Sequence, residues 1–192
     1  MFCAMANVRL VDADQAPLLA RPYYERGDPG PIVAALAQVP EVLEACLPFL
    51  GVVYGRSAVP ARRKELVVLR TSALLRCRYC VEAHTVVALD AGVSPAEVRA
   101  LLGLEPTEAV FADPAELTLL AWVDAVAGGV GPVDPSLRAG LAGHFDDYEV
   151  VELTLLAGAT LMLNRFCTAL ELPTSPETLR RLAAAGVAGA VR

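Results

Sequence analysis

The sequence has few aromatic side chains, few basic ones and no apolar run long enough to cross a membrane. Phe, Trp and Tyr make up 6% of the 192 residues, Lys64 is the only lysine, and the formal net charge is −6. We expect no nucleic-acid partner, because phosphate contacts need a basic face. The longest nearly apolar stretch, residues 153–163, is too short to span a bilayer. Residues 1–6 lack the basic start and apolar segment of a signal peptide, so we expect a soluble, cytoplasmic protein that binds no membrane.

Cysteine occurs in an odd number, and most of the five residues lie far apart in the sequence. Cys3, Cys46 and Cys167 are scattered, which argues against the disulfide framework of a small secreted domain. Cys46 and Cys167 have apolar neighbours, and we interpret them as small core side chains. Cys77 and Cys80 form a close pair. In a reducing compartment such a pair is typical of a redox-active or a metal-binding site.

Proline repeatedly follows a short oxygen-bearing side chain, a pattern typical of helix starts. The first residue of each pair can cap the helix, and proline at the first helical position loses nothing by lacking an N–H. The pairs are Ser94-Pro95, Asp113-Pro114, Asp134-Pro135 and Ser175-Pro176. Glu97 and Glu116 each follow a cap by three residues, which predicts two capping boxes.

Apolar residues between these starts recur with helical spacing, and strand alternation bounded by hairpin turns is absent from the sequence. We therefore predict one all-α domain over residues 1–192. Its expected parts are an irregular N-terminal arm (1–30), a helix pair that carries the main motif (60–92) and a long, largely buried helix (146–171).

Basic residues are concentrated at the two ends of the first helix of that pair. Arg62, Arg63 and Lys64 are interpreted as a solvated helix face. Arg76 and Arg78 flank the first cysteine of the close pair, where positive charge favours a thiolate.

The most informative residues lie between Glu65 and His84. If a helix begins at Cys77, then Cys77, Cys80 and His84 occupy positions i, i+3 and i+7 on one face. Cβ atoms three positions apart are about 5–6 Å from each other, close to what a disulfide tolerates. Both cysteines fall in the first turn, where unpaired N–H groups and the helix dipole favour an anion. His84 can accept the proton of Cys80, and Glu65 from the preceding helix is expected to orient the imidazole.

This spacing of glutamate, C-x-x-C and histidine resembles the alkyl hydroperoxidase D group of the carboxymuconolactone decarboxylase-like superfamily. The resemblance is specific over residues 65–84 and looser over 60–92 and the later helix with Asn164-Arg165-Phe166. It implies a compact all-helical fold and a homo-oligomer, either a dimer, a trimer or a hexamer. It also implies a cofactor-free antioxidant oxidoreductase with peroxiredoxin-type activity on hydroperoxide or disulfide substrates. The implied reductant is a dithiol, such as a lipoylated carrier protein or a thioredoxin-like protein.

The same resemblance assigns roles within the dithiol. Cys80 attacks the peroxide and is activated through His84 and Glu65, and Cys77 resolves the product into a redox-active disulfide. Some relatives place a further histidine just before the second cysteine, where this chain has Tyr79. A tyrosine hydroxyl is a poor base at neutral pH, so the proton relay is expected to differ at this point.

Three other readings of these residues stay open at this stage. Cys77, Cys80 and His84 supply three zinc ligands, and a closed site would need a fourth from Glu65 or Cys46. A decarboxylase-like enzyme would use the glutamate and the histidine alone for acid–base chemistry. A redox sensor or structural homologue would keep the fold without turnover.

Overall fold

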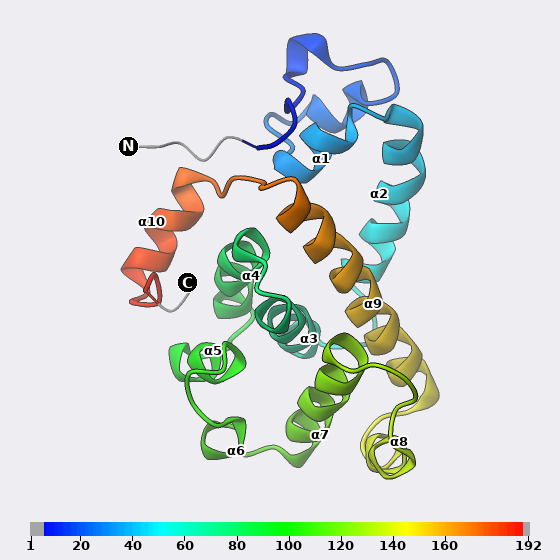
Figure 1. Cartoon of the computed structure of the whole chain (residues 1–192), viewed down its shortest axis with the longest axis vertical. Coiled ribbons are helices and arrows are strands. Elements are labelled where there is room, and N and C mark those ends of the chain that lie inside the picture. The colour runs from blue at the N-terminus through cyan, green and yellow to red at the C-terminus, as the bar shows by residue number, and fades with distance from the viewer. Residues whose placement is uncertain (1–5, 190–192) are drawn as a thin grey trace.

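The computed structural model describes residues 6–189, and this part of the chain is helical and contains no strand. Cys3 lies outside the described residues. The longest helix, α9, passes beside α2 and against α3 and α4, which form the centre of the molecule (Figure 1). The helices and helical turns are η1 (Ala13–Gln15), η2 (Arg21–Tyr24), α1 (Pro31–Leu36), α2 (Pro40–Tyr54), α3 (Ala61–Leu74), α4 (Arg78–Asp90), α5 (Pro95–Leu101), α6 (Thr107–Val110), α7 (Pro114–Val123), η3 (Asp124–Gly128), α8 (Pro135–Ala142), α9 (Asp147–Ala169) and α10 (Pro176–Ala184).

All four predicted Ser-Pro and Asp-Pro helix starts are confirmed, because each Ser or Asp side chain accepts a backbone N–H of its own first turn. The capping box of Ser94 and Glu97 is also confirmed. The second predicted box is wrong. Asp113 caps α7 through the N–H of Ala115, whereas Glu116 bonds to Arg62 of α3 instead.

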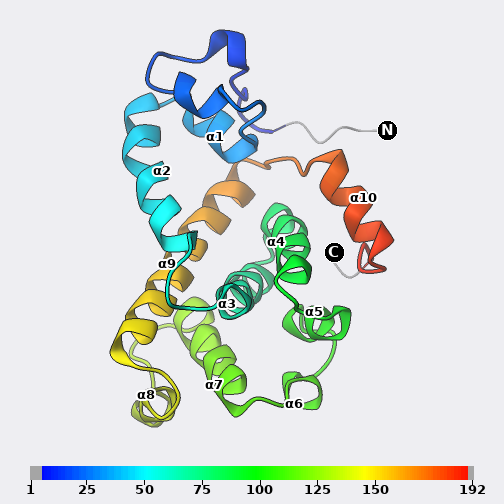
Figure 2. The same ribbon diagram turned by 180° about the vertical axis from the view of Figure 1, so that it is seen from behind.

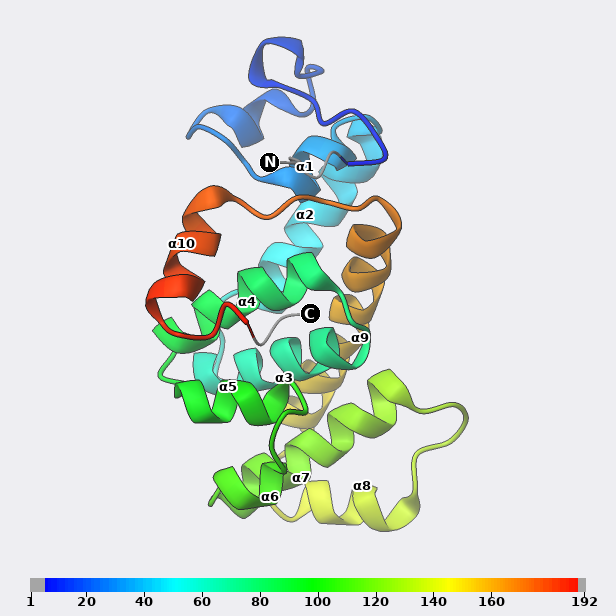
Figure 3. The same cartoon turned by 60° about the vertical axis from the view of Figure 1, so that its left-hand side comes forward.

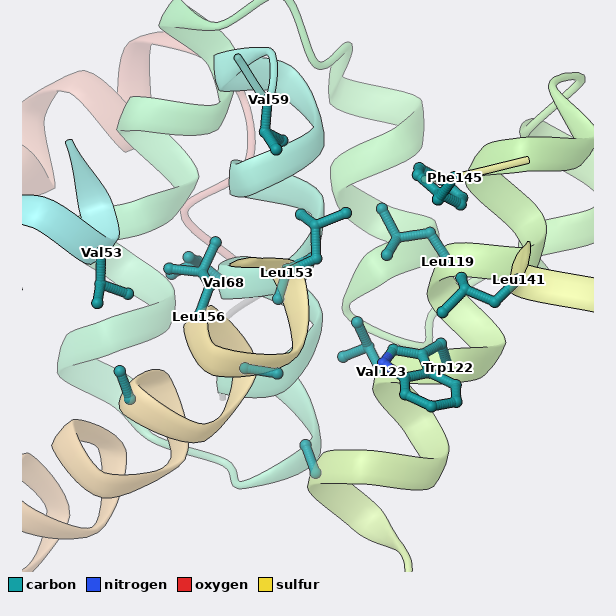
Figure 4. Packing of buried hydrophobic residues seen from close by; sticks show 14 of the residues in the cluster. Val53, Val59, Val68, Leu119, Trp122, Val123, Leu141, Phe145, Leu153 and Leu156 are labelled. Carbon is teal, nitrogen blue, oxygen red and sulfur yellow. The ribbon is translucent and has the colours of Figure 1, made fainter. Parts of the chain in front are cut away.

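The main core lies where α3, α7 and α9 meet. Val68 of α3 and Leu156 of α9 are buried in one cluster with Leu119 and Trp122 of α7 (Figure 4). The Trp122 indole donates to the Thr154 hydroxyl of α9 at 3.0 Å, which satisfies its N–H at the edge of this core. The core is thus built largely from Leu, Val and Ala, which allow helices to pack closely.

Helix α9 has the expected length, but its expected burial is only half correct. Its inward face holds Leu153, Leu156 and Cys167, while Val151 and Leu155 on the other face are exposed to solvent. By length and composition it is the one helix within residues 6–189 that could cross a membrane, which corrects the expectation drawn from residues 153–163 that no segment is long enough. It packs against α2, α3 and α4.

The expectation of a solvated face at the start of α3 is wrong, because those side chains form ion pairs between helices. Arg62 Nε lies 2.7 Å from Glu116 Oε1 of α7, and its Nη2 lies 2.5 Å from Glu97 Oε1 of α5. Lys64 is buried, with its ammonium 2.5 Å from Glu152 Oε1 of α9. These ion pairs therefore link α3 to α5, α7 and α9.

The N-terminal arm lies over the C-terminal end of α9 and beside α2, as Figures 1 and 2 both show. Its described part, residues 6–30, is irregular apart from two short 3₁₀ turns, as expected. The Asn7 backbone N–H donates to the Leu170 carbonyl at 2.9 Å, and Val8 and Leu10 pack over Cys77 and its neighbours. The arm therefore covers the start of α4 from solvent.

Candidate active site

Cys77 is placed by the way α3 ends. The Cys77 N–H donates to the Ser72 carbonyl and the Arg76 N–H to the Ala73 carbonyl, each at 3.1 Å, which is the bonding pattern of a Schellman motif. The residue in the left-handed position is Arg76, with φ of 53°, where glycine is usual. This reversal brings α4 back alongside α3 and sets Cys77 at its N-terminus (Figure 3).

The predicted helix from Cys77 is confirmed, with Cys77 as the N-cap of α4. Its Sγ accepts the N–H of Cys80 at 3.4 Å. The four described cysteines, among them this pair, are free thiols, and both members of the pair are buried. The two sulfurs therefore share the first turn of α4, as the C-x-x-C spacing predicts.

A third thiol joins this pair. The interpretation of Cys167 as a small core side chain is confirmed, and the core in which it packs also holds Cys77 and Cys80. Cys167 comes from the last turn of α9, is 1% exposed, and lies in the same buried cluster as Cys77 and Cys80. We refer to Cys77, Cys80 and Cys167 as the thiol cluster. No short sequence signal identifies Cys167, because it lies far along the chain from the other two and reaches them only through the packing of α9 on α4.

Hydrogen bonding distributes the protons of the thiol cluster unevenly. Side-chain hydrogen bonding with Cys167 and Cys80 lowers the Cys77 pKa to about 3 against the effect of burial, and Thr168 and the Cys80 N–H lower it further. Donating to Cys77 raises the Cys167 pKa to about 12. The Cys80 pKa is raised through its bonds with Cys167 and Cys77 and through burial. The resting negative charge therefore belongs on Cys77.

This charge does not depend mainly on the flanking arginines. Hydrogen bonds are the main causes that lower the Cys77 pKa, while Arg78 is largely exposed and points to Glu82 at 3.7 Å. The sequence correctly indicated that Cys77 carries the thiolate, but the main cause is hydrogen bonding and not the charge of Arg76 and Arg78.

The predicted link between Glu65 and His84 is confirmed. Glu65 Oε2 of α3 lies 3.1 Å from His84 Nδ1 of α4, and both side chains are mostly buried. A carboxylate at Nδ1 favours the tautomer with its proton there, which leaves Nε2 free to accept a proton.

Tyr54 belongs to the same neighbourhood, and sequence reasoning missed it. Its ring centroid lies 6.1 Å from that of His84, and its hydroxyl is 2.8 Å from the Thr160 Oγ1. Burial is the main cause that raises its pKa, and negative charge on Cys80 and Glu65 adds to the effect. Its hydroxyl therefore stays protonated and can act only as a hydrogen-bond partner near neutral pH.

Tyr79 stands where some relatives have a histidine, and its surroundings keep it neutral. Burial raises its pKa, and nearby sulfur charge on Cys167, Cys80 and Cys77 raises it further. Its ring packs against the apolar cluster around the thiols. It therefore acts as packing and not as a base.

Two cavities border the site from different sides. One of 310 Å³ is lined by Cys77 and Cys167 together with Arg76, Arg78 and Thr168. The other, of 420 Å³, is lined by Glu65, Tyr54 and Val87. Two members of the thiol cluster thus line one cavity, and the Glu65 side chain lines another. In residues 6–189 no group of three or more His, Cys, Asp or Glu side chains is arranged to hold a metal ion.

The part of the chain that carries most of this site matches a protein-family model. The model of the carboxymuconolactone decarboxylase family matches residues 40–125, which run from α2 into η3 and include Glu65, Cys77, Cys80 and His84. Over these residues, which make up a little under half of its length, the chain is similar to the alkyl hydroperoxidase D-like, carboxymuconolactone decarboxylase-like superfamily. Cys167 lies outside the matched residues.

Two curated relatives are similar in sequence. YnjA, an uncharacterized protein of Escherichia coli, is 26% identical over 82% of this chain and 88% of its own length. An alkyl hydroperoxide reductase of Mycobacterium tuberculosis is 35% identical over 77 residues, which are 40% of this chain and only 21% of the reductase.

Solved structures share the fold over most of the chain. A peroxidase-related protein from Silicibacter sp. TM1040 matches with a TM-score of 0.79 at 20% identity, covering 90% of this chain and 93% of its own. An Agrobacterium tumefaciens protein described as a possible antioxidant defence protein matches at 26% identity and a TM-score of 0.64, covering 73% and 95%. The debrominase Bmp8, solved with 2,3,4-tribromopyrrole, matches at 17% identity and a TM-score of 0.75, covering 93% and 96%.

Proposed function

We propose that the chain is a thiol-dependent peroxidase that cycles between a Cys77–Cys80 dithiol and its disulfide. The observation that carries the proposal is the pair of free thiols in the first turn of α4, one turn before a histidine already bonded to a carboxylate. The names of the Mycobacterium reductase and of the peroxidase-related structure support a peroxide as the substrate.

The first step oxidises Cys80. Its raised pKa means that it needs a base, and His84 is one helical turn away with Nε2 free. His84 takes the proton, and the Cys80 thiolate attacks the terminal peroxide oxygen. The S–O bond forms as the O–O bond breaks, and the protonated imidazole returns the proton to the departing alkoxide. The products are a Cys80 sulfenic acid and an alcohol.

The second step closes the disulfide. Cys77 already carries the thiolate, so it needs no base to attack the Cys80 sulfur. The S–S bond forms, the S–O bond breaks, and the departing hydroxide takes a proton and leaves as water. A dithiol reductant then restores both thiols by two thiol–disulfide exchanges. The cavity beside Cys77 is the side from which we expect it to approach.

The expected partners follow from this cycle. The reductant is a small dithiol on a carrier or thioredoxin-like protein, and the dithiol state suits the cytoplasm. A second copy of the chain is the expected partner for the exposed apolar side chains of α2 and α9. Val52 is 77% and Val151 66% exposed there, and with Leu155 they border a 560 Å³ cavity. An apolar surface of this kind is typical of a subunit interface.

A turnover assay tests the function. Hydrogen peroxide or tert-butyl hydroperoxide is supplied with dihydrolipoamide, and peroxide loss is followed. The parent protein and the Cys46→Ser control should turn over, while Cys80→Ser should fall to the uncatalysed rate. Equal rates for Cys80→Ser and parent would rule the proposal out. Because the fold also serves a debrominase, 2,3,4-tribromopyrrole belongs in the substrate panel.

A further inference from the structure

Cys167 has no role in the two-cysteine cycle, yet it is one of the three thiols that share protons at the start of α4. It packs in the same buried cluster as Cys77 and Cys80, and its own burial is almost complete. It comes from α9, which the matched family model does not reach. Of the three thiols, Cys77 and Cys167 line the 310 Å³ cavity.

We propose that Cys167 is a third redox-active cysteine, which takes over the disulfide from Cys80 and forms a Cys77–Cys167 bond on the cavity side. This inference rests on the proposed function, because that cycle supplies the Cys77–Cys80 disulfide from which it starts.

The exchange is balanced without any further reactant. The Cys167 sulfur attacks the Cys77 sulfur of the Cys77–Cys80 disulfide. The Cys77–Cys167 bond forms, the Cys77–Cys80 bond breaks, and the electron pair leaves with the Cys80 sulfur. Cys80 takes the proton that Cys167 gives up, so nothing is oxidised or reduced overall.

The proton-sharing pattern explains why this attack becomes possible only after oxidation. In the dithiol state Cys167 is held as a thiol chiefly because it donates to the charged Cys77 sulfur, whereas its bond with Cys80 lowers its pKa. Once Cys77 is part of a disulfide, it carries no charge, and the main reason for the raised pKa is gone. Cys167 then gives its proton to the departing Cys80 sulfur, which lies in the same buried cluster.

The exchange places the reduction of peroxide and the re-reduction of the disulfide at different positions in the molecule. Cys80 returns to the thiol state one turn before His84, and the Glu65 side of the site has its own cavity. The new disulfide consists of the two sulfurs that border the other cavity, between Arg76 and Arg78. A reductant that enters this cavity therefore meets the Cys77–Cys167 bond directly.

The sequence makes the test direct, because trypsin separates the three cysteines. Cleavage after Arg76, Arg78 and Arg165 places Cys77, Cys80 and Cys167 in three different peptides. The full-length protein is reduced, oxidised with limiting peroxide, quenched in acid at successive times and blocked with N-ethylmaleimide. Mass spectrometry of the digest then identifies which two cysteines are joined.

The expected result is that the Cys77–Cys80 linkage appears first and the Cys77–Cys167 linkage grows at its expense. At equilibrium the two should lie within about tenfold of each other, since both are buried disulfides formed by a common sulfur. Cys167→Ser and Cys167→Ala should lose the second linkage, and Cys46→Ser should leave the ratio unchanged. Diamide treatment of Cys80→Ser should join Cys77 to Cys167 directly.

Two results would overturn the inference, and they separate it from the proposed function. If the parent protein turns over but shows only Cys77–Cys80, and Cys80→Ser never joins Cys77 to Cys167, then Cys167 is not a redox cysteine and the peroxidase cycle stands. If the parent neither turns over nor forms any disulfide within the thiol cluster, both proposals are wrong.

Discussion

The Glu65 carboxylate on α3 lies 3.1 Å from Nδ1 of His84 on α4, so two helices together orient one imidazole. If Nε2 of this ring removes the Cys80 proton, His84→Gln should lower kcat/KM for peroxide about 100-fold or more, the usual contribution of a general base. Glu65→Gln should have a smaller effect, because the base remains but its orientation and tautomer are no longer fixed. Steady-state kinetics across pH measure both, with the exposed His144→Gln as the matched control. Parent-like rates in His84→Gln would show that this imidazole is not the base.

The Cys77 thiolate depends first on the Cys167 S–H group, so Cys167→Ala should raise the Cys77 pKa from about 3 toward its ordinary value of 9.0. Absorbance of the thiolate at 240 nm, followed from acid to neutral pH in the reduced protein, measures the shift. Cys77→Ser identifies the signal that belongs to this sulfur. A titration in Cys167→Ala that coincides with that of the parent would show that Cys167 does not donate to Cys77.

The same thiolate links stability to pH. The Cys77 pKa is lower in the folded chain than in the unfolded chain. Between about pH 3 and 9, Cys77 is therefore protonated in the unfolded state and ionised in the folded state. Because the unfolded state binds more protons in this range, the free energy of unfolding of the reduced protein increases as pH rises. Above pH 9 the sign reverses, because the raised pKa values of Cys167 and Cys80 keep protons on the folded state. Urea unfolding from pH 5 to 8 should show a rise in the reduced parent that Cys77→Ser lacks. Parallel pH curves for the two proteins would contradict this assignment.

The Tyr79→Phe variant tests whether the proton relay from Cys80 needs a base at position 79. Because the Tyr79 hydroxyl stays protonated, Tyr79→Phe should leave kcat/KM unchanged and keep the packing of the ring. A large loss of rate in this variant, with the fold intact by circular dichroism, would assign the hydroxyl a direct part in proton transfer.

The sequence predicted the local parts of this molecule well, because they depend on neighbouring residues. The four helix caps, the position of Cys77 at a helix start and the pairing of Glu65 with His84 all follow from short-range spacing and one familiar motif. These are interactions within a helix or between two consecutive helices.

What the sequence did not predict depends on contacts between distant segments. Lys64 looked solvated because its partner Glu152 lies on α9. The position of Cys167 beside the other two thiols was not predicted, because nothing near it in the sequence points to them. The exposed face of α9 was missed for a related reason. An apolar helix has the same composition whether its second face meets the core, solvent or another subunit.

The buried ion pair of Lys64 and Glu152 should contribute considerably to the free energy of unfolding. Their side chains are 6% and 14% exposed, and the Lys64 ammonium also donates to the Gly55 carbonyl at 2.6 Å. Glu152→Gln leaves the ammonium without its counter-charge and should cost about 3 kcal/mol of unfolding free energy. The exposed pair of Glu177 and Arg180 is the control, where Glu177→Gln should cost about 1 kcal/mol or less. Chemical denaturation measures both, and equal losses would show that burial does not strengthen the α3–α9 contact.

The exposed apolar face of α2 and α9 should mediate self-association. Val151 and Leu155 lie together on the outer side of α9, and Val52 of α2 borders the same cavity. A charge in the centre of such a contact would be buried without a partner, so Val151→Asp should convert the oligomer into a monomer. Light scattering after size exclusion measures the mass, and circular dichroism checks that helix content is retained. Leu104→Asp, at another exposed leucine, is the matched control and should leave the mass unchanged. An oligomer that survives both Val151→Asp and Leu155→Asp must use a different surface, and an α2–α9 contact between subunits would then be ruled out.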